Sequence, residues 1–443
     1  MNSRLLAADI LEQCLEGEGQ SHLLLRGCFA SHPDLSGRDR GLITALVHGT
    51  LSRALTLDFY LAQVSRTDPA DLKPYMRTVL RMSLYQMKYM DRIPASAICN
   101  EAVKLIRRRL GEGLTSFANG VLRAAARKTD WREPEGAAAL SLPKELYEKW
   151  LFLYGEERVR RMGESFLEPP ALWGRRMMSR CTEEELLACL EGEGYYARPH
   201  ELFPQAIRLE KNKLAEKEAP PPDRLSAYQK GWLLWQDISA QLAVAAAAPK
   251  PGMRILDLCA APGGKSLQAA DLTENKGEII ACDISEEKCA LIREGAARTG
   301  ADSVQVLLSD ALKPRPEWEG AFDLVIADLP CSGLGVAGRK PEIKYRVTER
   351  DIRELAALQK RMLRQAVSYI KPGGRLLFST CTLSREENDE NADYLAAEAG
   401  LVPEDIKLAL PEGLLPQEKG RLTLLPGDID GDGFFISLFS RPE

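Results

Sequence analysis

The second half of the chain contains five short runs of hydrophobic residues, and helical patterns separate these runs. They span residues 253–258, 278–282, 304–308, 322–327 and 376–379. Short continuous runs of this kind are typical of strands that are buried on both faces of a parallel sheet. Because parallel strands need long crossovers between them, this half is expected to be an α/β domain with a doubly wound, Rossmann-like sheet.

The first 140 residues have the hydrophobic period of helices and lack the alternation of strands. Hydrophobic residues recur three and four positions apart at Leu42, Leu46 and Val47, and again from Val79 to Met87. Helix ends are expected near Pro69, Pro74, Pro94 and the glycines at 111 and 113. This pattern predicts a compact all-α bundle.

A shorter region of mixed pattern lies between these two halves. Two helical patterns, at 144–154 and 183–191, flank short strand-like pieces, and a stretch rich in proline, glycine and alanine precedes them at 131–139. The next segment, 231–241, is expected to be a helix that leads into the α/β domain. The expected domains are therefore an all-α domain at 1–140, a small α+β domain at 141–224 and the α/β domain at 225–443.

Two cysteines follow the last two predicted strands. Cys331 lies in the motif Asp-Leu-Pro-Cys, which begins at Asp328, and Cys381 lies in Ser-Thr-Cys-Thr. Strand ends at one edge of a doubly wound sheet meet at the ligand crevice, so the two thiols could share one active site. The alternative is a pair of ordinary buried thiols, and the matching positions of the two cysteines make it the weaker interpretation.

The loop after the first predicted strand has the composition of a cofactor site. It reads Cys259, Ala260, Ala261, Pro262, Gly263, Gly264, Lys265 and Ser266. Small residues allow close approach of a ligand to the backbone, and a helix that starts here favours negative charge. The loop fits neither a Walker A motif nor the dinucleotide glycine pattern. Asp283 and Asp310 follow the next two strands, where carboxylates could bind ribose hydroxyls and an adenine amino group, although a lone Asp there is more often a helix cap.

Together these motifs resemble the RNA cytosine-C5 methyltransferases. The shared motifs are Asp-Leu-Cys-Ala-Ala-Pro-Gly-Gly-Lys at 257–265, Asp-x-Pro-Cys-Ser-Gly at 328–333 and Ser-Thr-Cys at 379–381, with further matches at 340–344 and 432–435. The resemblance covers roughly residues 225 to 443. It implies S-adenosyl-L-methionine as the methyl donor, held by the loop 259–265 and by Asp283, Asp310 and Asp328.

The resemblance also implies a catalytic role for four residues. Cys381 would add to C6 of cytosine as the nucleophile, and Cys331 would assist release of the product. Lys265 and Asp328 would contact the target base. DNA cytosine enzymes attack with the Pro-Cys thiol instead, so the presence of both cysteines favours RNA.

The N-terminal region resembles the NusB domain, which binds RNA, through segments 93–103 and 117–123. Residues 1–140 contain 19 Lys and Arg against 15 Asp and Glu, which gives this region a charge of +4. Because the net charge of the whole chain is −5, the remaining residues carry −9. Arg107–Arg109, Arg123, Arg127 and Lys128 could contact phosphates, and a solvated helix face is an equally good interpretation.

The middle region corresponds to the small RNA-recognition-like domain that family members carry. Here the chain departs from the usual Leu-Arg-x-Asn strand and has Ala-Leu-Trp-Gly-Arg-Arg-Met at 171–177. The fusion of a NusB-like domain to this enzyme narrows the resemblance to the RsmB/Sun/Fmu type, which methylates a cytosine in 16S ribosomal RNA. Attack at C6 requires an unpaired or flipped-out cytosine, since C6 is shielded in a stack, so a hairpin loop is the expected target.

Other classes of site are disfavoured by the sequence. All four histidines precede residue 201, and no Cys-x-x-Cys spacing occurs, so we expect no metal and no serine-histidine site in the second half. Residues 428–433 imitate the start of a calcium loop but lack its final glutamate and are expected to form a turn. The longest hydrophobic stretch is too short for a bilayer, and ten cysteines without paired spacing indicate a reducing compartment, so a cytoplasmic monomer is expected.

Two alternatives stay open. A transfer-RNA cytosine methyltransferase would share every catalytic residue and would differ only in its substrate. A non-catalytic RNA-binding or antitermination factor would follow from the N-terminal domain alone.

Overall fold

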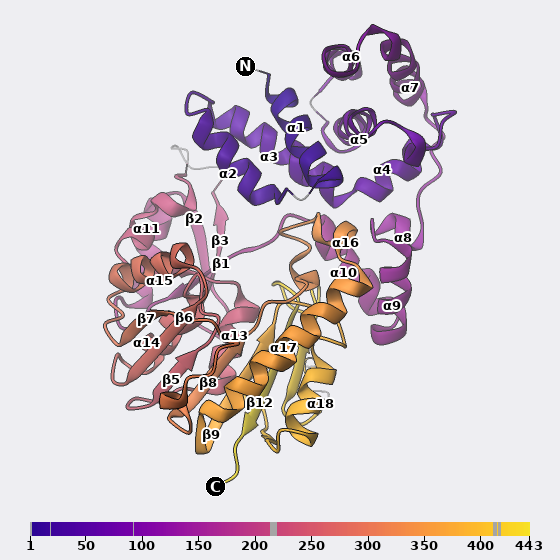
Figure 1. Cartoon of the computed structure of the whole chain (residues 1–443). Helices are drawn as coiled ribbons and strands as arrows, with labels where there is room; N and C mark the ends of the chain where they lie inside the picture. Colours follow the sequence, from indigo (N-terminus) through magenta and orange to yellow (C-terminus); the bar gives the residue numbers. More distant parts are fainter. Residues whose placement is uncertain (1, 18, 92, 213–218, 411–413, 415–417) are drawn as a thin grey trace. The chain divides into compact units, whose positions relative to one another are not determined.

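The structure, a computed structural model, describes residues 2–17, 19–91, 93–212, 219–410, 414 and 418–443 (Figure 1). These residues form two compact units. One contains the chain up to Pro169 together with Ala337–Arg346, and the other contains Pro170–Val336 and Val347–Glu443. The predicted domain boundaries at 140 and 224 stay predictions.

The first unit is helical, as predicted from the hydrophobic period. Leu46, Val47 and Val79 are completely buried in its core. Pro74 occupies the first turn of its helix, where a missing N–H costs nothing. Its helices are α1 (Ser3–Glu16), α2 (Ser21–Ser31), α3 (Gly37–Ser52), α4 (Ala54–Leu61), α5 (Pro74–Tyr89), α6 (Ala95–Leu110), α7 (Thr115–Arg127), α8 (Gly136–Ala139), α9 (Lys144–Tyr154), α10 (Glu156–Leu167) and α16 (Ile343–Arg346).

The segment Ala337–Arg346 belongs to this helical unit although it lies in the sequence between Cys331 and Cys381, which both belong to the other unit. The buried Glu342 carboxylate accepts hydrogen bonds from the N–H and the hydroxyl of Ser21, at 2.9 Å each. The Lys344 ammonium donates to the Ser52 carbonyl at 2.8 Å, and burial lowers the pKa of Lys344 to about 7. The motif at 340–344 therefore holds this segment within the helical unit.

The second unit contains a small antiparallel sheet with the order β2-β3-β1-β4. Its elements are β1 (Leu172–Arg176), α11 (Glu183–Gly192), β2 (Tyr195–Pro199), β3 (Ala206–Lys211), α12 (Ser226–Gln229) and β4 (Leu233–Trp235). The expected helix at 231–241 is wrong: β4 pairs with β1 through Leu233–Trp235, and a helix starts only at Ile238, after Asp237 caps it. Pairing with a distant strand overrides the local pattern here.

The larger sheet has the order β10-β12-β9-β8-β5-β6-β7, and β11 pairs with β12. The five predicted strands all form and are parallel, whereas β10, β11 and β12 add antiparallel pairs at one edge. The remaining elements are α13 (Ile238–Ala247), β5 (Arg254–Asp257), α14 (Gly264–Leu272), β6 (Glu278–Asp283), α15 (Glu286–Thr299), β7 (Val304–Leu308), β8 (Phe322–Asp328), α17 (Glu349–Tyr369), β9 (Ile370–Thr380), α18 (Asp389–Ala397), β10 (Val402–Pro403), β11 (Arg421–Leu424) and β12 (Phe434–Ser440). The predicted turn at 428–433 joins β11 to β12.

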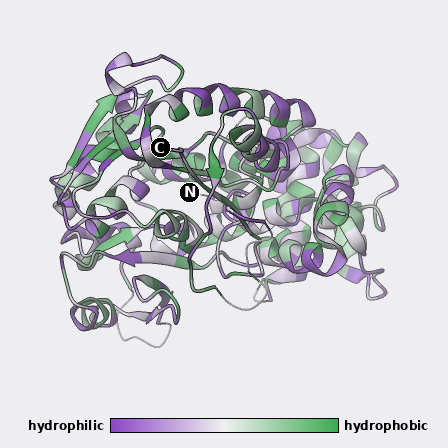
Figure 2. Cartoon of the chain, turned by 90° about the horizontal axis from the view of Figure 1, so that it is seen from below, coloured by the Kyte–Doolittle hydropathy of each residue, from purple (hydrophilic) through white to green (hydrophobic). Residues whose placement is uncertain are grey.

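Hydrophobic cores cover both faces of this sheet. Successive strand residues face opposite sides, so Ile255 packs in the cluster that includes residues of α13, and Leu256 packs in the cluster that includes residues of α17. Hydrophobic and hydrophilic residues accordingly alternate along many elements in the hydropathy view (Figure 2). The strand order reverses between β5 and β8, and the crevice beyond their carboxyl ends is where such sheets bind ligands.

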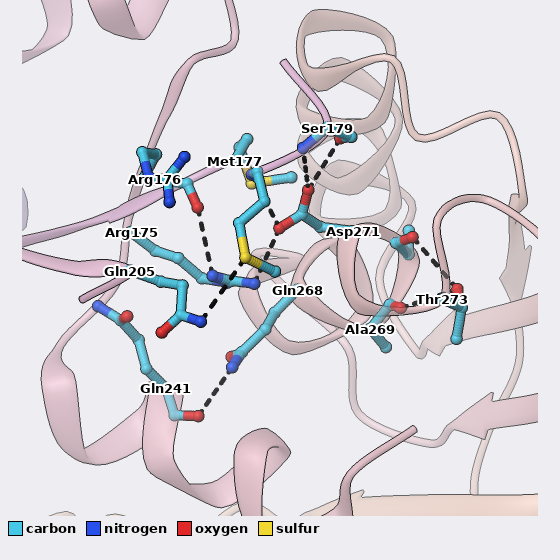
Figure 3. A network of polar contacts seen from close by, with 12 residues as sticks. Arg175, Arg176, Met177, Ser179, Gln205, Gln241, Gln268, Ala269, Asp271 and Thr273 are labelled. Atoms are coloured by element: carbon cyan, nitrogen blue, oxygen red, sulfur yellow. Dashed lines mark hydrogen bonds and ion pairs between the residues drawn. The ribbon is translucent and has the colours of Figure 1, made fainter. Parts of the chain in front are cut away.

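A buried ion pair joins the small sheet to α14 (Figure 3). The Arg175 guanidinium donates to the Asp271 carboxylate at 2.8 Å, and the two side chains are 2% and 0% exposed. The same carboxylate accepts hydrogen bonds from the N–H groups of Met178 and Ser179 and from the Ser179 hydroxyl. Arg175 belongs to the strand that departs from the usual family pattern, and its buried ion pair stabilises the packing of β1 against α14 within this unit.

Asp271→Ala is expected to destabilise the chain by about 3–5 kcal/mol, because it leaves the Arg175 charge buried without its partner. Chemical denaturation of wild type and variant measures the difference. Asp302→Ala, which removes an exposed carboxylate, is the control and should change stability little. Equal stability of Asp271→Ala and wild type would show that the pair contributes nothing.

Candidate active site

Two adjoining hollows lie at the crevice between β5 and β8. The larger has a volume of about 280 Å³, and its lining includes Cys259, Ala261, Asp283, Asp310, Asp328, Cys331 and Cys381. The smaller has a volume of about 170 Å³, and its lining includes Gln236, Asp257, Cys259, Ala260, Ala261, Pro262, Gly264, Lys265 and Asp328. Among the residues predicted for the site, only Gly263 lines neither hollow; it is the residue before α14 and has a φ of 109° that suits glycine.

The two predicted cysteines are in contact. Their sulfur atoms are 3.4 Å apart, since β8 and β9 are parallel neighbours and each cysteine follows the end of its strand. The hydrogen bond to Cys381, together with burial, raises the pKa of the Cys331 thiol well above its ordinary value. Cys331 is therefore protonated near neutral pH and can donate a proton toward the Cys381 sulfur.

A close ion pair lies beside the cysteines. The Lys265 ammonium is 2.6 Å from one oxygen of the Asp328 carboxylate, and the other oxygen accepts a hydrogen bond from the Ser379 hydroxyl at 2.7 Å. The same ammonium lies 5.1 Å from the centre of the Phe434 ring, from the motif at 432–435. These contacts fix the orientation of Asp328 in a hollow that it shares with both thiols.

The smaller hollow brings acceptor atoms and the N-terminus of α14 together. Among the described residues, Asp257 Oδ1 and Gln236 Oε1 are buried without a hydrogen-bond partner, and both residues line the smaller hollow. Burial raises the pKa of Asp257 to about 7, and its second oxygen accepts a hydrogen bond from Ser266 at 2.6 Å. The free acceptors suit an amino group, and the first turn of α14 suits a carboxylate. An amino-acid ligand carries both of these groups.

The other two predicted carboxylates line the larger hollow. Asp283 accepts a long hydrogen bond of 3.4 Å from the Ala261 N–H and is 3.6 Å from the Lys288 ammonium. Asp310 accepts a hydrogen bond from the Leu312 N–H at 2.9 Å, which is the local cap that a lone Asp often makes. The second oxygen of Asp310 is not engaged in that bond, so the cap and a role in binding are compatible.

Sequence reasoning missed the polar residues behind the two cysteines. Glu387 and Gln359 are completely buried there and bind the Cys331 loop. No local pattern indicated this position for Glu387, since it follows Arg385 and Glu386 in a segment that is typical of a charged surface turn. Gln236 and Asp257 were likewise not predicted as lining residues of the site.

The predicted basic face of the helical unit is partly neutralised by ion pairs. Arg107 contacts Glu112, Arg109 contacts Glu12 at 3.2 Å, and Lys128 contacts Asp130 at 3.1 Å. Three further arginines of this set are exposed: Arg108, Arg123 and Arg127.

The described residues contain no cluster of three or more metal-ligating side chains. Each helix among them is too short or too polar to cross a bilayer.

Comparison with protein families assigns all three parts of the chain. Residues 244–440 match the model described as 16S rRNA methyltransferase RsmB/F, and residues 1–127 match the NusB family. Residues 142–215 match the ferredoxin-like domain of RsmF/B-like methyltransferases. The predicted order of domain types is confirmed.

Curated relatives resemble the chain over nearly its whole length. A Bacillus subtilis (strain 168) protein named "Probable ribosomal RNA small subunit methyltransferase B" is 36% identical, with 98% of this chain and 97% of the relative covered. An Escherichia coli O1:K1 protein named "Ribosomal RNA small subunit methyltransferase B" is 32% identical, with 98% of each chain covered.

Solved structures show the same fold. The crystal structure of PH0851 covers 100% of this chain and 99% of its own, with a TM-score of 0.79 and 25% identity. A methyltransferase homolog from Pyrococcus horikoshii covers 69% of this chain and 97% of its own, with a TM-score of 0.59 and 26% identity.

Proposed function

The chain belongs to the RsmB/F family of 16S rRNA methyltransferases, and from this premise we propose that it methylates C5 of a cytosine in 16S rRNA through a covalent bond between Cys381 and C6. The observation that carries the proposal is the pair of thiols 3.4 Å apart in the crevice of the sheet. Two thiols of purely structural use would have no reason to meet in a hollow that is also lined by Asp328, the partner of the Lys265 ammonium.

The chemistry requires a thiolate, because C5 of cytosine is a poor nucleophile until a group has added to C6. Cys381 forms the S–C6 bond, and the electron pair moves toward C5, which takes up the methyl group. S-adenosylmethionine supplies that methyl group as an electrophile. The C5 proton then passes to solvent water, its electron pair re-forms the C5–C6 double bond, and the S–C6 bond breaks so that the Cys381 sulfur leaves with the electron pair of that bond.

The position and the raised pKa of Cys331 suit it to the release step. The hydrogen bond with Cys381 and burial hold the Cys331 thiol in its protonated form, which is a poor nucleophile. A protonated thiol 3.4 Å from the attacking sulfur is instead suited to protonate that sulfur as it leaves C6. These two properties support Cys331 as the residue that assists release, and the role of Cys381 as the nucleophile rests on the resemblance of its Ser-Thr-Cys motif to that of the RNA enzymes.

Lys265 and Asp328 are proposed to hold the target base. Their ion pair of 2.6 Å and the Ser379 hydroxyl fix the Asp328 carboxyl group in the hollow that contains the thiols. A proton shared between the Asp328 carboxyl group and N3 of cytosine draws electron density from C6 and so favours attack by the thiolate.

The loop 259–265 and three carboxylates are proposed to bind S-adenosylmethionine. Asp257 Oδ1 and Gln236 Oε1 suit the amino group of the methionine part, and the N-terminus of α14 suits its carboxylate. Asp283 is proposed to bind the ribose hydroxyls and Asp310 the adenine amino group, and both residues line the larger hollow. Asp328 lines both hollows, which supports a role beside the cofactor as well as beside the base.

Asp283→Ala is expected to weaken S-adenosylmethionine binding by roughly 10- to 100-fold, since hydrogen bonds to a charged group contribute about 1.5–3 kcal/mol. Isothermal titration calorimetry of the cofactor measures this change without RNA. Glu287→Ala, an exposed carboxylate on α15, is the control and should bind as wild type does. Unchanged affinity in Asp283→Ala would exclude the proposed contact with the ribose.

The substrate is tested by methyl transfer from labelled S-adenosylmethionine to unmodified 16S RNA and, in parallel, to bulk tRNA. Incorporation into 16S RNA that appears as 5-methylcytosine after nuclease digestion is expected. Label in tRNA alone would keep the chemistry and overturn the substrate. No label in either RNA, with no binding of S-adenosylmethionine, would favour a non-catalytic RNA-binding factor.

The preferred RNA is expected to carry its cytosine in a hairpin loop. C6 is shielded in a stacked, paired helix, and extrusion of a paired base costs a few kcal/mol. A fully paired RNA is therefore expected to react at roughly one hundredth of the rate of the hairpin, or more slowly. Initial rates on a minimal hairpin and on the same sequence annealed to its complement give the comparison. Equal rates on both RNAs would contradict the loop target.

A further inference from the structure

A completely buried carboxylate, Glu387, holds the loop that carries Cys331. One oxygen of Glu387 accepts the Ser332 N–H at 2.8 Å and the Gln359 side chain at 3.2 Å, and the other accepts the Ser332 hydroxyl at 2.5 Å. Gln359 also donates to the Pro330 carbonyl at 2.8 Å. The residues on both sides of Cys331 are thus fixed by side chains from outside the loop.

The next residue in the chain, Asn388, holds the loop that carries Cys381. Its side-chain oxygen accepts the Thr380 hydroxyl at 2.5 Å, and its amide nitrogen donates to the Thr382 carbonyl at 2.9 Å. Both neighbours of Cys381 are therefore bound by one buried side chain.

A third contact connects the two loops directly. The hydroxyls of Ser332 and Thr382, each the residue after a cysteine, lie 2.6 Å apart. Glu387 binds one member of this pair, and Asn388 binds the backbone of the other.

We propose that Glu387 and Asn388 are positioning residues that set the separation between the two sulfur atoms, Glu387 by fixing the Cys331 loop and Asn388 by fixing the Cys381 loop. The roles of the two thiols rest on the proposed function, whereas their separation does not. Because Glu387 and Asn388 are consecutive and directly precede α18, one short segment fixes both loops against each other.

The choice of a carboxylate supports this role. A buried carboxylate is costly unless hydrogen bonds compensate for its lost hydration, and burial raises the pKa of Glu387. Glutamate offers acceptor oxygens to the N–H and the hydroxyl of Ser332 at once. The three strong contacts therefore define the position of Ser332, and Cys331 precedes it directly.

The separation of the thiols can be measured without RNA or cofactor. Phenylarsine oxide forms two As–S bonds with a close pair of thiols and releases one water molecule, so its affinity reports how well the pair is preformed. Wild type is expected to bind it tightly at Cys331 and Cys381, and Cys331→Ser, which removes one thiol, identifies the share of binding due to this pair. Glu387→Ala is expected to weaken this binding at least 10-fold, and Glu390→Gln, an exposed neighbour, should leave it unchanged.

Kinetics of methyl transfer provide the second readout. Glu387→Ala is expected to lower kcat by about 100-fold, the loss typical of a misplaced reacting group, while KM for S-adenosylmethionine changes less than about twofold. Glu387→Gln, which keeps the length and one acceptor oxygen, should restore most of the rate. Unchanged arsenical affinity together with unchanged kcat in Glu387→Ala would overturn the proposal.

A milder variant covers the case in which Glu387→Ala does not fold. Ser332→Ala removes the hydroxyl that joins Glu387 to Thr382 and leaves the Ser332 N–H bond intact. It should weaken arsenical binding several-fold, and wild-type affinity would overturn the proposal. If wild type transfers no methyl group to RNA, the proposed function fails, but the arsenical titration still tests the separation of the thiols.

Discussion

Cys381→Ala is expected to abolish methyl transfer to RNA and to leave S-adenosylmethionine binding intact. The variant lacks the only atom proposed to add to C6, so C5 stays a poor nucleophile even when the base and the methyl donor are both bound. The loss should reach roughly 10⁴-fold or more, since removal of a nucleophile in other covalent enzymes has effects of this size. Label transfer to unmodified 16S RNA and calorimetry with the cofactor measure the two halves of this prediction.

Cys189→Ala serves as the matched control for this variant. Cys189 is a half-buried thiol on α11, outside both hollows, and its removal should leave the rate unchanged. If Cys381→Ala still transfers label at a rate close to that of wild type, Cys331 is the nucleophile and Cys381 is the residue that assists release.

Cys331→Ala is expected to accumulate a covalent complex with RNA that survives denaturing electrophoresis. Attack by Cys381 does not need Cys331, but release does, because the protonated Cys331 thiol 3.4 Å away is the proposed proton donor to the departing sulfur. Most of the enzyme should be found in the complex when S-adenosylmethionine and RNA are both in excess, whereas wild type should show little. Turnover in Cys331→Ala should fall by roughly 100-fold or more, as for loss of a general acid.

Two further variants test whether the trapped complex depends on the proton of Cys331 and on the Cys381 thiol. Cys331→Ser keeps a proton donor of lower acidity and should accumulate less complex than Cys331→Ala does. The double variant with Cys381→Ala should form no complex, because no thiolate attacks. If Cys331→Ala turns over as fast as wild type without a trapped complex, Cys331 has no part in release.

The sequence predicted those parts of the site that lie at the ends of buried strands. The run at 322–327 became the strand β8 at the expected position because a mainly hydrophobic run of this length is stable chiefly inside a sheet. The meeting of Cys331 and Cys381 followed from the same rule, since the carboxyl ends of neighbouring parallel strands adjoin. Both inferences needed only local sequence and the geometry of parallel sheets.

Features that depend on distant partners were not predictable in this way. Arg175, Lys344 and Glu387 carry side chains that are usually exposed, and each is buried by a partner at least 28 positions away: Asp271, Ser52 and Gln359. The helix expected at 231–241 failed for the same reason, since Leu233–Trp235 gains a strand partner in β1 that local propensity does not reveal. Long-range pairing of this kind is visible only once the fold is known.

The most direct test of the central claim is the identity of the cysteine that bonds to RNA. A 16S fragment that contains 5-fluorocytidine at its target position forms an adduct that cannot resolve, because fluorine replaces the C5 proton that must leave. Wild type incubated with this RNA and S-adenosylmethionine, digested and analysed by mass spectrometry, should yield a methylated nucleotide on the peptide that contains Cys381. An adduct on the peptide that contains Cys331, or no adduct despite methylation of the natural RNA, would contradict the account.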